Sequence, residues 1–161
     1  MTPAAIPANE ADRLTALYRY RIIDTAAEAA FDDFTQLAAQ ICETPIAVIS
    51  LVDETRQWSK SQVGIDAPQT PRDISFCGHA IHANKVFEVA NTLDDERFFD
   101  NPAVSGEAGI RFYAGAPLLT PQGEAIGTLC VLDKVPRQLS QPQKTALVTL
   151  ARQVLRQMDL R

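Results

Sequence analysis

The stretch that decides the fold reads GIRFYAGAPLLTPQGEAIGTLCVLD and spans residues 109–133. Two runs of small, β-branched and aromatic residues, 110–119 and 125–132, favour strands. Between them, Thr120-Pro-Gln-Gly123 has Pro at its second position and Gly at its fourth, which is typical of a type I turn. Both alternating faces of the second strand are apolar or small, so we expect other elements to cover both sides of the sheet. The stretch therefore predicts a β-hairpin within a three-layer α+β sandwich.

Earlier segments supply further strands of this sheet. Residues 46–52, IAVISLV, are apolar and β-branched, and residues 57–63 partly alternate, so we expect two antiparallel strands. Residues 86–90 predict another short strand. The connection over residues 91–109 is longer than most loops, and such long connections often serve a function. We expect it to form a lid over one face of the sheet.

Helical patterns precede and follow the strands. Asn9 can cap a first amphipathic helix. Thr25-Ala-Ala-Glu28 has the spacing of a capping box and predicts a second helix, which ends near Glu43 because Thr44-Pro45 follows. Ser140-Gln-Pro-Gln143 is a second capping box, with Pro in the first turn, and predicts a long final helix with an apolar stripe.

Composition excludes several classes of function. The net charge is −5, whereas surfaces that bind nucleic acids or anionic membranes need clustered Lys and Arg. The sequence has no signal-peptide pattern and no apolar run long enough to span a bilayer, and its three cysteines are irregularly spaced, as in reduced proteins. We expect a cytoplasmic protein that binds neither nucleic acid nor membrane. Residues 1–8 are predicted to be a disordered lead, and residues 9–161 a single domain.

Residues 75–82, SFCGHAIH, contain both histidines of the chain. Ser75, the first residue of this segment, can cap a helix over residues 76–84. The thiol of Cys77 would then lie in the first turn of that helix, where the helix dipole lowers its pKa. His79 would lie about 200° around that helix from Cys77, so the pair does not form a nucleophile and base. His79 and His82 could share a face, but no zinc motif supplies further ligands. We predict a pocket roof with no metal and no catalytic residue.

Several segments together resemble one protein family. NEADRLTALYRYRIIDT (9–25), IAVISLVDETRQWSKSQVG (46–64), PRDISFCGHAI (71–81), the hairpin stretch and LSQPQ (139–143) are similar, in this order, to GAF domains of bacterial signalling proteins. The most similar are those found ahead of histidine kinase or diguanylate cyclase modules. The resemblance implies a central antiparallel sheet of five or six strands with the terminal helices on one face. It also implies a small-molecule pocket on the other face, roofed by the short helix and the long loop, and dimerisation through the terminal helices.

Subclasses of this family differ in ways that the sequence can test. Bilin-binding members carry a cysteine followed directly by histidine, whereas Gly78 separates Cys77 from His79 here. Cyclic-nucleotide-binding members have an Asn-Lys…Phe…Asp-Glu pattern; Asn84-Lys85 and Asp95-Glu96 are present here, but no phenylalanine stands at the required place before Asp95. Free methionine-R-sulfoxide reductases have a segment similar to Cys77-Gly-His-Ala-Ile81, but their other cysteines have no counterpart here, because Cys42 and Cys130 fall on the second helix and the last strand.

The resemblance predicts a sensory domain that binds an unidentified small molecule and signals through its terminal helices to a partner or to a kinase or cyclase output domain. We predict that the protein is not an enzyme. Two alternatives stay open, a reductase-like enzyme that uses Cys77 and a ligand-free dimerisation module. The candidate ligand-binding residues lie in the matching motifs or beside the lid; they are Trp58, Phe76, Cys77, His79, Arg111 and Tyr113.

Overall fold

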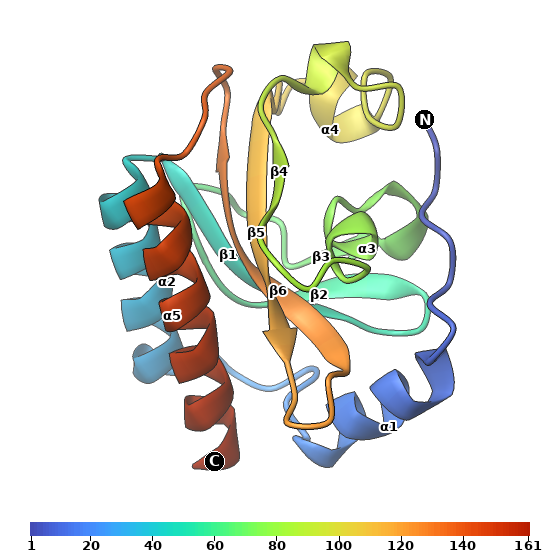
Figure 1. The fold of residues 1–161 in the computed structure, drawn as a ribbon, viewed down its shortest axis with the longest axis vertical. Helices are drawn as coiled ribbons and strands as arrows, with labels where there is room; N and C mark the ends of the chain where they lie inside the picture. Colours follow the sequence, from blue (N-terminus) through green and yellow to red (C-terminus); the bar gives the residue numbers. More distant parts are fainter.

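A six-stranded antiparallel sheet forms the centre of the computed structural model, which describes residues 1–161 (Figure 1). Its strands are β1 (Ile46–Val52), β2 (Arg56–Val63), β3 (Gln69–Pro71), β4 (Phe87–Val89), β5 (Phe112–Leu119) and β6 (Ala125–Asp133). The strand order is β3-β2-β1-β6-β5-β4, so the buried strands β1 and β6 are central. The hairpin of β5 and β6 was predicted correctly, whereas β3 was missed.

Two long helices cover one face of the sheet. They are α2 (Ala29–Cys42) and α5 (Gln141–Asp159), and a shorter helix, α1 (Glu10–Arg19), precedes them. Helices α2 and α5 run side by side on the sheet, and α1 lies at the end of the sheet near the β5–β6 turn (Figure 1). A core of 22 buried residues joins these helices to the sheet, including Leu17, Phe31 and Val154. This layer matches the expected packing of the terminal helices.

Short elements cover the opposite face. They are the helices α3 (Cys77–Ala80) and α4 (Pro102–Ser105) and the 3₁₀ turns η1 (Arg72–Ile74) and η2 (Thr92–Asp94). A second core, of 15 buried residues, fills the space beneath them. The connection over residues 91–109 contributes Phe98 and Val104 to this core, while Phe99 is 49% exposed. The three-layer α+β sandwich is therefore confirmed.

Two local predictions were wrong. Thr25 and Glu28 do not form a capping box, because the side chain of Lys60 is fully buried and binds both: its Nζ donates to Thr25 Oγ1 at 2.8 Å and forms an ion pair with Glu28 at 2.5 Å. The helix expected over residues 76–84 covers only Cys77–Ala80. Short helices are marginal, and the glycine within this one lowers its helix propensity further, so the chain leaves the helix early to reach β4.

The first eight residues contain no helix or strand and run along α3 (Figure 1). The Thr2 amide donates to the Arg97 carbonyl at 3.2 Å, and the two histidines donate to the carbonyls of Thr2 and Ala5. The disorder of this lead and the limits of the domain stay predictions. No helix has both the length and the apolar character needed to cross a bilayer.

Candidate functional site

A cavity of about 190 Å³ lies between the sheet and the short elements on its second face. Strand residues such as Val48 and Leu132 form its floor, residues 74–77 form its roof, and Ala103 and Ala108 of the lid close one side. Twelve of its 16 lining residues are hydrophobic, and none carries a charged side chain. The predicted pocket between the sheet, the short helix and the long loop is therefore present.

Strand alternation decides which side chains reach this cavity. Successive residues of a strand point to opposite faces of the sheet. In β2, Gln57 and Ser59 line the cavity, while Trp58 lies between them and packs into the core on the helix face. In β5, Tyr113 lines the cavity and its neighbour Phe112 packs into the helix-face core.

One end of the cavity carries a buried cluster of thiols and hydroxyls. Cys77 Sγ lies 3.1 Å from Tyr113 Oη and 3.1 Å from Thr128 Oγ1, and Cys130 lines the same wall. Gly115 makes room for this arrangement, since a Cβ at that position would lie 2.4 Å from Tyr113 Oη. The side chain of Ser50, also on this face, has a buried Oγ without a hydrogen-bond partner.

The groups of this cluster differ in the direction of their pKa shifts. Burial opposes ionisation of Cys77, but hydrogen bonds from Cys130, Thr128 and other neighbours outweigh it and lower the pKa of this thiol. The hydrogen bond to Cys77, together with burial, raises the pKa of Cys130 well above its usual range, and burial does the same for the pKa of Tyr113. Cys77 is therefore the first group of the cluster to lose a proton. Because Cys77 is only 1% exposed, a reagent must enter the cavity to reach it.

His79 and Arg111 lie outside the cavity. His79 Nε2 donates to the Thr2 carbonyl at 2.8 Å, and its ring meets Phe98 edge-on at 4.8 Å. Burial lowers the pKa of His79, so the ring is neutral at pH 7. Arg111 Nη1 donates to the Val104 carbonyl at 2.8 Å and so ties the lid to the start of β5.

The structure brings together three of the six predicted ligand-binding residues. Phe76, Cys77 and Tyr113 line the cavity. Trp58 lies on the other face of the sheet, and His79 and Arg111 lie outside the cavity. Gln57 and Ser59 were missed, although their alternation with the large apolar Trp58 was a signal for them. A ligand-binding role for any of these side chains stays a prediction.

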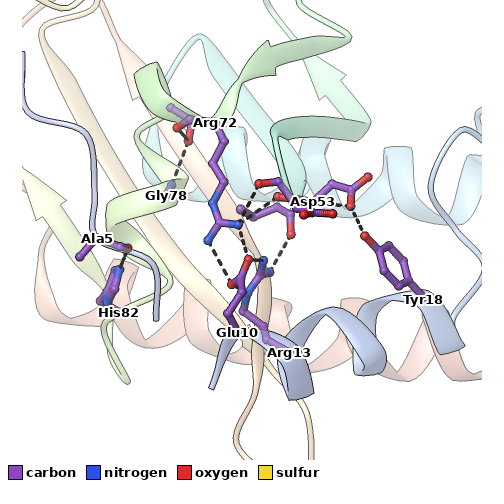
Figure 2. A network of polar contacts seen from close by, with 11 residues as sticks. Ala5, Glu10, Arg13, Tyr18, Asp53, Arg72, Gly78 and His82 are labelled. Atoms are coloured by element: carbon purple, nitrogen blue, oxygen red, sulfur yellow. Dashed lines mark hydrogen bonds and ion pairs between the residues drawn. The ribbon is translucent and has the colours of Figure 1, made fainter. Parts of the chain in front are cut away.

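A network of ion pairs connects α1 to the region below the cavity roof (Figure 2). The Glu10 carboxylate accepts hydrogen bonds from Arg13 Nε at 2.8 Å and from Arg72 Nη2 at 3.2 Å. Arg13 is 1% exposed and also donates to the Val52 carbonyl at 2.6 Å. Burial works against the charge of Glu10, but the bonds from Arg72 and Arg13 lower its pKa from 4.5 to about 2. The carboxylate is therefore ionised throughout the physiological range.

Arg72 continues this network into the roof of the cavity. It belongs to η1, and its carbonyl accepts from Ser75 Oγ at 2.8 Å. Ser75 Oγ in turn accepts from the Gly78 amide at 3.1 Å, at the start of α3. Ser75 was predicted as the N-cap, but α3 begins one residue later and Phe76 occupies the N-cap position; the Ser75 hydroxyl still accepts from an amide of the first turn. Arg72 thus connects the two helices, since its side chain binds Glu10 of α1 and its backbone carbonyl binds Ser75, which in turn binds Gly78 of α3.

Comparison with known proteins places this arrangement in a family. The sequence profile of the GAF domain matches residues 26–158. The chain belongs to the GAF domain family. The GAF domain of the Acinetobacter phosphoenolpyruvate-protein phosphotransferase has the same fold, with a TM-score of 0.66, 19% identity and coverage of 92% of both chains. A type II free methionine-R-sulfoxide reductase from Thermoplasma acidophilum also shares the GAF fold, with a TM-score of 0.66, 11% identity and coverage of 81% of this chain and 90% of that chain.

A curated relative corrects one prediction. A cyclic di-GMP phosphodiesterase of Pseudomonas aeruginosa is 44% identical over 137 residues, which make up 85% of this GAF domain chain and 23% of the relative. The chain thus spans less than a quarter of that relative's length. We predicted that the protein is not an enzyme, and this match overturns that prediction because it relates the chain to an enzyme. It also supports the broader prediction of a bacterial signalling context.

Proposed function

We propose that this GAF domain is the regulatory part of a bacterial cyclic di-GMP phosphodiesterase and that it senses a small molecule in the cavity beneath α3. The similarity to the Pseudomonas aeruginosa enzyme supports the first half, because the matched segment is only 23% of that protein and so corresponds to one module of it. The cavity supports the second half. It lies beneath a helix of only four residues and is closed on one side by residues of the lid.

The route to the output follows the hydrogen bonds that connect the roof to α1. A ligand that favours one position of α3 would shift the populations of the whole domain toward that position. Ser75 and Arg72 hold α3 to Glu10, so the position of α3 is coupled to that of α1. The N-terminal helix is thus one path by which the occupied cavity reaches the phosphodiesterase module.

We also propose that two copies associate through α2 and α5 and that the protein works in the cytoplasm. Leu37 and Ile41 are 44% and 39% exposed on α2, and Leu155 of α5 is only partly buried. These side chains form an apolar surface on the helix layer. In light scattering, Ile41→Glu should turn a dimer into a monomer, while Gln40→Glu on the same helix should not. A wild-type monomer at micromolar concentration would rule out the dimer.

The three free, buried thiols support the proposed location in the cytoplasm, where cysteines stay reduced.

Native mass spectrometry of the freshly purified protein tests the sensor. We expect the native mass to exceed the denatured mass by that of a bound small molecule. Ala103→Leu, which fills the cavity from the lid, should remove the extra mass, and Ser105→Leu, at an exposed position of the same short helix, should keep it. A protein that retains no ligand and that no small molecule stabilises against heat would contradict the sensor function.

A further inference from the structure

The cavity selects against charge. None of its lining residues is an aspartate, glutamate, lysine, arginine or histidine. The basic groups around it are already engaged: Arg72 pairs with Glu10, and Arg111 donates to the carbonyls of Val104 and Ile110. A charged group in an apolar cavity without a partner costs several kcal/mol, so a phosphate, a carboxylate or a zwitterion does not fit here.

The volume of the cavity limits the size of its occupant. It measures about 190 Å³. An apolar protein cavity of about 150 Å³ holds benzene, whereas pockets for drug-sized ligands start at about 300 Å³. The occupant is therefore close to one aromatic ring with a small substituent. Phe76 and Tyr113, whose rings stack on each other with centroids 5.1 Å apart and planes 16° apart, give the cavity an aromatic wall.

One fully buried polar atom of the lining lacks a hydrogen-bond partner. Gln57 lines the cavity, and its Oε1 is buried without a hydrogen bond. The two serines of the lining are satisfied, because Ser59 Oγ donates to the Ala67 carbonyl at 3.1 Å and Ser75 Oγ to the Arg72 carbonyl at 2.8 Å. A buried acceptor without a donor is costly, so a ligand that donates one hydrogen bond to Gln57 is favoured.

We propose that the cavity binds an uncharged, mainly apolar molecule about the size of a single aromatic ring, which donates one hydrogen bond to Gln57. This inference rests on the proposed sensor function and names the ligand class of the same site. Phenol is the simplest probe with all three properties. Toluene lacks the donor, benzoate adds a negative charge, and cyclic GMP adds both charge and size.

Isothermal titration calorimetry of the wild-type protein with these four probes tests the ligand class. We expect phenol to bind with a dissociation constant below about 1 mM, toluene to bind about threefold to tenfold more weakly, and benzoate and cyclic GMP not to bind. Gln57→Leu should weaken phenol binding to the level of toluene and leave toluene unchanged. Gln122→Leu, in the exposed β5–β6 turn, is the matched control and should bind both probes as the wild type does.

The outcomes separate this inference from the proposed function on which it rests. If benzoate or cyclic GMP binds more tightly than phenol, and Ala103→Leu abolishes that binding, the sensor function holds and the uncharged ligand class is overturned. If phenol binds but Gln57→Leu does not weaken it, the assigned hydrogen bond is overturned. If no probe binds and the native protein also retains no ligand, both the ligand class and the sensor function fail.

Discussion

Replacing Glu10 by glutamine tests the network that connects α1 to the cavity roof. The substitution keeps the size of the side chain but removes the anion shared by Arg13 and Arg72, which are 1% and 7% exposed. Two buried guanidinium groups are then left close together without a counter-charge, and one of the shared hydrogen bonds is lost. The variant therefore measures how much this one carboxylate contributes to the free energy of unfolding.

The expected size of the effect follows from the pKa of Glu10. A fall in the pKa from 4.5 to about 2 corresponds to at most about 3 kcal/mol. The side chain is still 17% exposed, so solvent screening reduces this value, and we expect Glu10→Gln to lower the free energy of unfolding by about 2 kcal/mol. For a domain of this length, that corresponds to a fall in Tm of about 4–8 °C.

Thermal unfolding followed by circular dichroism between pH 7 and pH 2.5 is the assay. The lowered pKa means that the stabilisation is fully present above the unfolded pKa of 4.5 and is lost as the pH falls toward 2. The gap in Tm between wild type and variant should therefore be largest near pH 7 and narrow below about pH 4.5. Asp12→Asn, an exposed residue in the same first turn, should change Tm little. Equal Tm values at pH 7, or a gap that stays constant down to pH 2.5, would refute this reasoning.

Three further predictions follow from the packing. Gly127→Ala should lower the free energy of unfolding in urea by more than about 2 kcal/mol, because the new Cβ would lie 2.0 Å from the Ser50 carbonyl oxygen; an unchanged urea midpoint would count against the close approach of β1 and β6. Ser140→Ala removes the capping box of α5 and should cost about 1 kcal/mol, with no loss expected if the cap does not form in solution. A disulfide-exchange reagent should modify none of the three cysteines of the native protein within minutes but all three after denaturation, since each is at most 2% exposed; fast labelling of the native protein would contradict this burial.

The strands of the sheet could be predicted from the sequence more reliably than the hydrogen bonds that cap the helices. Strands β1, β5 and β6 could be predicted because most of their residues are apolar or small, and all but one of their positions are buried. The edge strand β3 has only three residues, two of them exposed, and pairing with β2 alone defines it. The same capping-box spacing had different outcomes at Ser140 and Thr25, because only Thr25 lies next to the buried amine of Lys60. Local spacing cannot reveal such a partner 35 residues away.

The residues of the site could be predicted only in part, because their positions also depend on partners that are distant in the sequence. Of the residues named from the matching motifs, Phe76, Cys77 and Tyr113 line the cavity, whereas Trp58 packs on the opposite face of the sheet. The register of β2, which turns Gln57 toward the cavity, depends on its pairing with β1, including the irregularity between Ile49 and Ser50. Likewise, Glu10 and Arg72 meet across 62 residues of sequence, so their ion pair is a product of the tertiary fold.

Hydrogen–deuterium exchange with and without saturating phenol tests most directly whether occupation of the cavity reaches the N-terminal helix. Exchange reports local opening of each segment. We expect phenol to slow exchange in α3 and also in α1, and Glu10→Gln to keep the effect in α3 but lose it in α1. Slower exchange in α3 together with unchanged exchange in α1 of the wild type would contradict the proposed route from the cavity to the output.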